Sequence, residues 1–318
     1  MILLLLACKP SPPTPLLPTG WFHDTGDTDF GPQGCSARVE DTRPDEGALW
    51  YWRDLPRIST TVEDPDRIQA YVVDASGYRL PSQLVWPEGS LNARVRLEAP
   101  LAPDADHVLR VVDCEGTRDV PFRTSTLGLP LIDGPATLEG KTYHLDLQGA
   151  DWVEPGGVAA LLTLYFDSPG LLDVAYVTEQ QLQLRFTLGY YSNNELRQDT
   201  SRELIPFPTV SFTDQPYFSA AATLVDLNFS GASIPVYDFA FEGTFAADGN
   251  SIGGGAVSGL GDTRYAGDLV SDDRPGAVCE LASGFGVTCV PCPDGMPYCL
   301  PVSVQNVEGT RIDMVLTP

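Results

Sequence analysis

The sequence has little positive charge. Lysine occurs only at Lys9 and Lys141, and the formal net charge of the 318 residues is −24. Phosphate backbones bind clustered cations, so such a surface repels nucleic acid. It also repels an anionic membrane surface. We therefore expect no nucleic-acid partner, and any membrane attachment must come from something other than surface charge.

Long apolar runs and helix-forming runs are missing too. No stretch of about 18 apolar residues occurs, so no membrane-spanning helix is expected in the mature chain. The sequence contains 30 glycines and 28 prolines, which favour many turns over long helices. Hydrophobic residues still make up 43%, enough to form cores. The composition predicts an all-β protein, and its length fits two domains after a leader.

The first residues are a leucine run that ends in Leu5-Leu6-Ala7-Cys8. This segment resembles the lipobox of bacterial lipoproteins, in which the signal peptide is cut before a cysteine that becomes lipidated. It departs from that pattern because no basic residues precede the leucine run. The resemblance implies a signal peptide over residues 1–7 and lipidation at Cys8. It also implies a cell-envelope location, with the membrane contacted only through the lipid.

Residues 8–34 are predicted to be a tether. Five prolines between positions 10 and 18 favour an extended, semi-rigid chain. The acidic segment Asp24–Asp29 follows, and we interpret it as a solvated spacer. A calcium loop is the alternative, but the terminal glutamate of such loops is missing. No metal or other cofactor is therefore expected.

Residues 35–126 are predicted to form the first domain. Apolar and polar residues alternate over 68–73 and 94–97, which marks half-buried strands. Four short segments resemble the bacterial Ig-like domains of S-layer and envelope proteins, namely Val73–Gly77, Leu97–Pro103, His107–Val111 and Phe122–Thr124. His107 stands where that family usually has tyrosine. The resemblance implies an Ig-like β-sandwich. Cys35 and Cys114 flank this domain and are expected to pair.

Residues 127–318 are predicted to form a larger antiparallel β-barrel or barrel-like sandwich. Alternation recurs over 143–147, 181–188, 237–245 and 312–316. Asp248-Gly249 is a hairpin signal, and Gly253–Gly255 permits a tightly curved strand. Val158–Phe166 is apolar on both faces and fits either a central strand or a short buried helix.

Four of the seven cysteines lie close together near the C-terminus. If Cys8 is lipidated, six cysteines remain, an even set that suits an oxidising compartment. Cys289-Val290-Pro291-Cys292 resembles the C-x-P-C pair of thiol-disulfide oxidoreductases, and the four cysteines could instead hold zinc. We expect two structural disulfides among Cys279, Cys289, Cys292 and Cys299. The pairing is left open, although a bond within 289–292 would be strained.

Other motifs give little support for catalysis. Gly249–Gly253 matches the G-x-S-x-G nucleophile pattern, but every histidine lies upstream, so a hairpin strand is expected. His144 and Asp146 are interpreted as a solvent-facing pair on one strand. Asp262-Thr263-Arg264 is interpreted as a loop cap instead of a ligand-facing ion pair. No phosphate-binding loop, H-E-x-x-H helix or nucleotide-binding glycine pattern occurs, so no catalytic residue is assigned.

This organisation predicts a cell-envelope lipoprotein with a non-enzymatic structural or binding role, an interpretation that rests on architecture alone. One alternative is a carrier of a small apolar ligand, held in a barrel lined by Phe239, Phe241, Phe245 and Leu184. A second alternative is a carbohydrate-active enzyme that uses paired carboxylates. The expected partner is therefore an envelope protein, a glycan or a small apolar molecule.

Overall fold

The computed structural model describes residues 36–317 except 65, 157–167, 230–231, 271 and 273. The expectations for residues 1–7, Cys8, the tether, Cys35 and Val158–Phe166 lie outside the described residues. Strands dominate the described part of the chain, which confirms the all-β class. None of the helices in these ranges has the length and apolarity needed to cross a bilayer.

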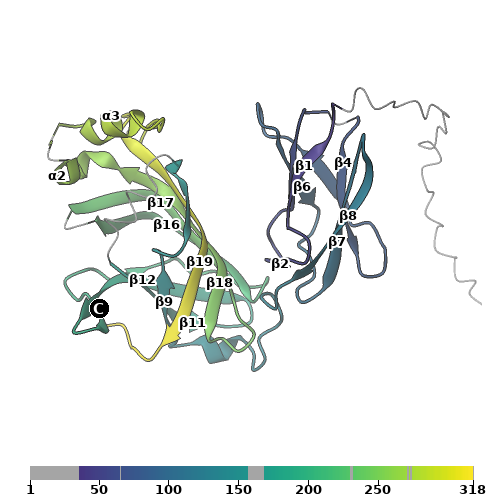
Figure 1. Ribbon diagram of the computed structural model, residues 1–318. Coiled ribbons are helices and arrows are strands. Elements are labelled where there is room, and N and C mark those ends of the chain that lie inside the picture. The colour runs from purple at the N-terminus through teal and green to yellow at the C-terminus, as the bar shows by residue number, and fades with distance from the viewer. Residues whose placement is uncertain are drawn as a thin grey trace, which may run out of the picture.

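The first domain is a β-sandwich of two four-stranded sheets (Figure 1). One sheet has the order β1 (Val39–Arg43), β3 (Arg57–Thr60), β6 (Asn92–Leu97) and β5 (Ser82–Val85). The other has the order β2 (Leu49–Trp50), β8 (Gly116–Thr124), β7 (Asp106–Asp113) and β4 (Gln69–Asp74). Alternate side chains of both sheets point inward, and Val72, Val95 and Leu109 are fully buried between them. The predicted strands over 68–73 and 94–97 are therefore confirmed.

His107 belongs to the core of this sandwich. Its side chain is buried and stacks on Phe122 with the ring centroids 5.5 Å apart. The imidazole Nε2 lies 3.4 Å from the carbonyl oxygen of Ala102. The imidazole thus packs in the interior as a planar ring, and its buried Nδ1 has no hydrogen-bond partner among the described residues.

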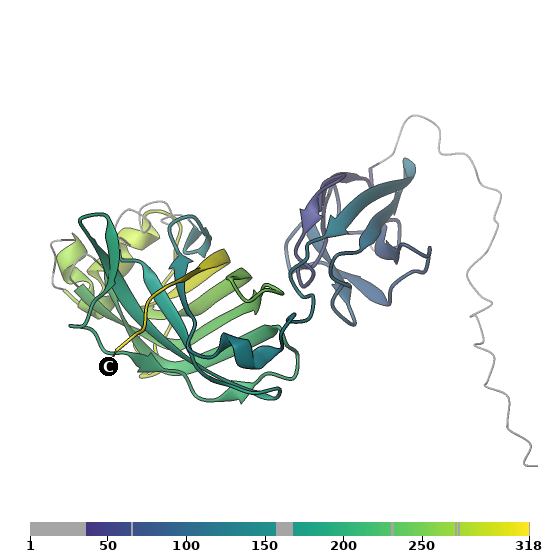
Figure 2. The ribbon, with the colours of Figure 1, turned by 90° about the horizontal axis from the view of Figure 1, so that it is seen from below.

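The second domain is built on one antiparallel sheet that curls around its own concave face (Figures 1 and 2). Its main path runs β13-β12-β11-β9-β19-β18-β17-β16; β10 pairs with β19, and β14 and β15 pair with β12. The strands are β9 (Thr142–Asp146), β10 (Asp151–Glu154), β11 (Gly170–Val177), β12 (Gln181–Ser192), β13 (Glu195–Gln198), β14 (Ile205–Pro206), β15 (Val210–Ser211), β16 (Tyr217–Phe229), β17 (Ala232–Phe245), β18 (Ser251–Asp262) and β19 (Cys299–Ile312). Because β15 also lies against β16, the two ends of the sheet approach each other. The domain is therefore barrel-like.

Short helices complete this domain. In the part of the domain that the structure describes, they are η1 (Pro135–Leu138), η3 (Thr263–Tyr265), α2 (Gly267–Val270) and α3 (Ala277–Ser283). The predicted strand over 312–316 is only partly present, because β19 ends at Ile312. Ile312 is opposite Thr142, the first residue of β9, so the partner strand stops there. Beyond Ile312, the alternating residues have no residue of β9 to pair with.

Glycines in β18 allow the sheet to bend. The pairing of β18 with β19 shifts register on both sides of Gly255, as in a β-bulge. Gly254 has φ +57, and the side chain of any other residue at this position would overlap the ring of Tyr51 in the first domain. The curvature predicted for Gly253–Gly255 is thus present, and glycine also allows the two domains to touch.

The contact between the domains is polar as well as aromatic. The Tyr51 hydroxyl and the Thr244 hydroxyl are 2.6 Å apart. The Arg53 guanidinium lies 3.6 Å from the centroid of the Tyr217 ring. Burial raises the pKa of Tyr51 to about 12, so its hydroxyl remains protonated at neutral pH. These contacts hold the β2–β3 loop against β16 and β17.

A buried ion pair links β11 and β12. Asp173 and Arg185 are directly opposite each other, and Arg185 Nε donates to Asp173 Oδ1 over 2.9 Å. Asp173 is almost fully buried, and its carboxylate raises the pKa of Arg185. We expect Asp173→Asn to lower the free energy of unfolding by about 3 kcal/mol, because it leaves a half-buried guanidinium without its counter-charge.

Urea denaturation measures this change. Glu195→Gln is the matched control, because it breaks the exposed pair between Glu195 and Arg197 on the neighbouring hairpin. That variant should lose less than about 1 kcal/mol. Equal losses for the two variants would contradict the structural role given to the Asp173–Arg185 pair.

Candidate functional site

The concave face of the second sheet contains an apolar cavity of about 100 Å³. The strands contribute aromatic and aliphatic side chains to its lining, chiefly Phe186, Phe207, Val236, Phe239, Phe241, Val302 and Val304. Phe239 lies between two of these rings, with its centroid 6.0 Å from those of both Phe186 and Phe207. The aromatic rings form one wall of the cavity, and this geometry suits a hydrocarbon group.

One end of the cavity is closed by a cap, which we define as residues 263–299 with the gaps given above. Ala266 and Val278 reach the cavity from the cap, and Leu300 does so from the start of β19. The hydroxyl of Thr263 donates to the carbonyl oxygen of Tyr298 over 2.7 Å, which ties the first residue of the cap to its last turn before β19. The cavity is therefore shaped jointly by the sheet and the cap.

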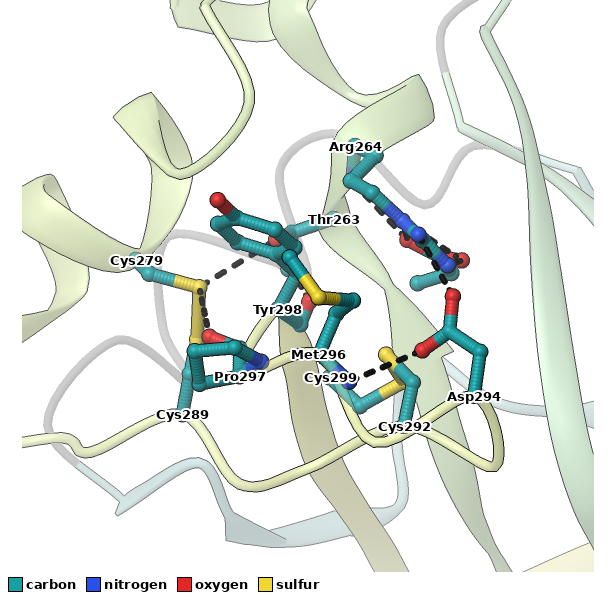
Figure 3. The surroundings of a disulfide bond; sticks show 11 residues. Thr263, Arg264, Cys279, Cys289, Cys292, Asp294, Met296, Pro297, Tyr298 and Cys299 are labelled. Atoms are coloured by element: carbon teal, nitrogen blue, oxygen red, sulfur yellow. Dashed lines mark hydrogen bonds and ion pairs between the residues drawn. A yellow bond between two sulfur atoms is a disulfide. The ribbon is translucent and has the colours of Figure 1, made fainter.

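Charged groups fix the cap from outside the cavity. Asp262 is fully buried and accepts a hydrogen bond from the backbone N–H of Arg264, so it caps η3. The Arg264 guanidinium also contacts Asp294 over 2.7 Å (Figure 3). The backbone N–H of Met296 and the charge of Arg264 both lower the pKa of Asp294. The interpretation of 262–264 as a loop cap is confirmed.

Two disulfides cross-link the cap. They join Cys279 to Cys289 and Cys292 to Cys299 (Figure 3). This is one of the pairings left open by the sequence, and it avoids the strained bond within 289–292. Cysteines paired in this way cannot bind zinc, and no His, Cys, Asp or Glu group in the described ranges has the arrangement of a metal site. Cys114 is also disulfide-bonded, while its expected partner Cys35 lies outside the described residues.

The predicted barrel lining is confirmed in part. Phe239 and Phe241 line the cavity, whereas Phe245 and Leu184 are fully buried elsewhere in the same core. Ser251, the centre of the G-x-S-x-G match, begins strand β18, so the hairpin interpretation is confirmed. Ala266 and Val278 were not identified from the sequence, because only the folded cap brings them to the sheet.

A second, polar pocket of about 290 Å³ lies on the outer face of β9 and β19. His144 and Asp146 both line it, as their shared strand face suggested. Glu308 is directly opposite Asp146, and the Tyr191 ring lies edge-on to His144 at 6.5 Å. One Asp146 oxygen accepts a hydrogen bond from the Gly149 N–H, so this carboxylate also holds a turn. The pairing of β9 with β19 brings Glu308 here, whereas Tyr191 comes from β12, which is not paired with β9.

Comparisons with known proteins give no family. No protein-family model matches the chain, and no curated protein matches it. Solved structures with weak similarity include an L,D-transpeptidase from Mycobacterium smegmatis, with 10% identity and a TM-score of 0.23 over 64% of this chain and 75% of that one. L,D-transpeptidase 1 of Mycobacterium tuberculosis has the same identity and TM-score over 54% and 82%. Extracellular domains 3–5 of Drosophila OTK have 9% identity and a TM-score of 0.17 over 54% and 60%.

The disulfides are expected to stabilise the cap against opening. Replacing both Cys292 and Cys299 with serine should lower the free energy of unfolding by about 2–4 kcal/mol, because the unfolded chain loses a cross-link. Urea denaturation measures the loss. The oxidised and the thiol-reduced wild type provide the matched comparison, since reduction should lower the midpoint at least as far. An unchanged midpoint in the double variant would show that the bond does not support the fold.

Proposed function

We propose that this chain is a cell-envelope lipoprotein with a non-enzymatic binding role, and that its second domain binds a small apolar group. The apolar cavity under the disulfide-stapled cap is the observation that carries this proposal. The first domain serves as a spacer of the bacterial Ig-like type, and its sandwich architecture supports that role. This proposal combines two interpretations of the sequence, a non-enzymatic binding role and the carriage of a small apolar ligand.

The size of the cavity limits the ligand. A cavity of about 150 Å³ binds benzene or xenon, so a cavity of about 100 Å³ accepts a group of a few carbon atoms. Burying one methylene contributes about 0.8 kcal/mol, so five such groups contribute about 4 kcal/mol. That free energy corresponds to a dissociation constant of about 1 mM. The natural ligand therefore places the end of a hydrocarbon chain in the cavity and gains further affinity outside it.

The anchor proposal is tested by fractionating cells. In Cys8→Ser the acceptor of the lipid is lost, so the protein should leave the membrane fraction and become soluble. The matched control is Ser11→Ala, which makes an equally small change in the same segment but leaves the acylated position intact. Retention of the Cys8→Ser protein on membranes would contradict lipid anchoring at this residue.

The binding proposal is tested by thermal unfolding with short alkanes such as butane and pentane as probes. These probes should raise the melting temperature of the wild type, because a ligand that binds only the folded state stabilises it. Ala266→Leu fills the cavity from the cap and should abolish the shift. Ala220→Leu is the matched control, since Ala220 is equally buried in the same core but does not line the cavity.

Three results would oppose the binding proposal. One is the absence of any shift in the wild type. Another is a shift that persists in Ala266→Leu while that variant remains folded. The third is the loss of the shift in both Ala266→Leu and Ala220→Leu, because the effect would then come from general overpacking of the core.

A further inference from the structure

Three arginines form a row across the outer face of one sheet of the first domain. Arg43 on β1 is directly opposite Arg57 on β3, and Arg57 is directly opposite Arg94 on β6. All three side chains are exposed on the same face. Neighbouring strands are about 4.8 Å apart, and like charges placed opposite each other destabilise a sheet. The fold alone gives no reason for this arrangement.

The row is only partly neutralised. Arg43 contacts Asp45 over 2.8 Å and Asp41 over 3.9 Å. The charge of Arg57 acts to lower the pKa of Asp54, but burial outweighs it and the pKa of Asp54 is raised. Within the described ranges, Arg94 is in no ion pair. A chain with 43 acidic residues has ample carboxylates to pair with it. Arg57 and Arg94 therefore keep positive charge available to solvent, with the carboxyl of Asp54 as the one acidic group among the described residues that lines the cleft beside them.

The row forms one wall of a cleft of about 700 Å³ to which both domains contribute. Asn306 of β19 reaches the cleft from the second domain. Asn306 has φ +56 and lies in the bulge of β19 opposite β18, where the ladder skips two residues. Its amide Nδ2 donates to Asp151 over 2.6 Å, which fixes the side chain. The cleft thus has a charged wall and a polar wall.

Other groups in the cleft suit hydroxyl groups and a flat ring. The Ser59 hydroxyl donates to Asn92 Oδ1 over 2.6 Å, which leaves the Asn92 amide nitrogen as a donor. Trp50 also lines the cleft; its indole N–H donates to the carbonyl oxygen of Asp54, which holds the ring in place. Amide and hydroxyl donors beside an aromatic ring can bind a sugar, and guanidinium groups bind carboxylate or phosphate through paired hydrogen bonds.

We propose that this cleft binds an acidic saccharide, with its carboxylate or phosphate groups on Arg57 and Arg94. Asn92 and Asn306 bind its hydroxyl groups, and Trp50 contacts a sugar ring. The cleft is concave and lies between two domains, so it suits an extended chain better than a flat membrane surface. This site is separate from the apolar cavity and does not depend on the ligand proposed for it.

Calorimetric titration of the full chain tests the proposal with three probes. Trigalacturonate carries carboxylates, phosphorylated maltotriose carries phosphate, and neutral maltotriose carries neither. At least one acidic probe should bind at low salt and neutral maltotriose should not, because the charge-assisted contacts supply most of the affinity. The acidic probe that binds identifies the charged group. Failure of both acidic probes to bind the wild type would overturn the proposal.

Two charge-matched variants locate the site. Arg57→Gln with Arg94→Gln should weaken binding by about tenfold or more, because each lost pair of hydrogen bonds is charge-assisted. Arg118→Gln with Arg197→Gln makes the same change in net charge at two residues that do not line the cleft. At an ionic strength of about 0.15 M this variant should change binding by less than about twofold, as expected for screened charges. Equal losses in both variants would mean nonspecific attraction and would overturn the proposal.

Thermal unfolding separates a binding role from a structural one. Removing Arg57 and Arg94 also removes the repulsion within the row, so the melting temperature of that variant should be unchanged or higher. A large fall in melting temperature would show that the arginines support the fold, and the site assignment would then fail.

Discussion

The second domain has one large sheet, and the apolar face of that sheet must be buried against itself. This constraint determines the barrel-like shape of the domain. A sheet of this many strands cannot remain open and flat without exposing an apolar surface. The bulges around Gly255 let it curve, and the contact between β15 and β16 brings its two ends together into a barrel-like shell. Curling leaves one end of the shell uncovered. The cap closes that end, and the apolar cavity is the space left between the rings of the sheet and the side chains of the cap.

The cap is held by cross-links because its helices are too short to be stable alone. α3 has seven residues and α2 has four, well below the length at which an isolated helix persists in water. The disulfides, the Asp262–Arg264–Asp294 contacts and the bond from Thr263 to Tyr298 supply what helix propensity cannot. Any group that enters the cavity from this end must pass a segment whose stability depends on these few contacts.

Local patterns predicted local structure well. Alternation over 181–188 and 237–245 predicted β12 and β17, and Asp248-Gly249 predicted the turn between β17 and β18. The alternation of apolar and polar residues shows only which side chains share a face. The alternation therefore extends past Ile312, although the partner strand β9 ends opposite that residue. The helices of the cap were missed, because segments of four to seven residues are too short for helical periodicity to appear.

The parts that depend on register or three-dimensional packing could not be predicted. Cysteine spacing allowed three pairings, and the folded cap selects one of them. The aromatic residues Phe239 and Phe241 were correctly expected to face inward, but whether they leave a void depends on how Ala266 and Val278 meet them. Arg43, Arg57 and Arg94 come together only through the pairing of three strands that lie far apart in the sequence.

The central claim is that the shell and its cap enclose a real and accessible apolar cavity. A crystal structure of the protein under xenon pressure tests it most directly, because xenon enters dry apolar cavities of this size. The account predicts a xenon atom between Phe239 and Val278, with the surrounding side chains in place. A cavity filled by repacked side chains, with no xenon bound, would contradict it.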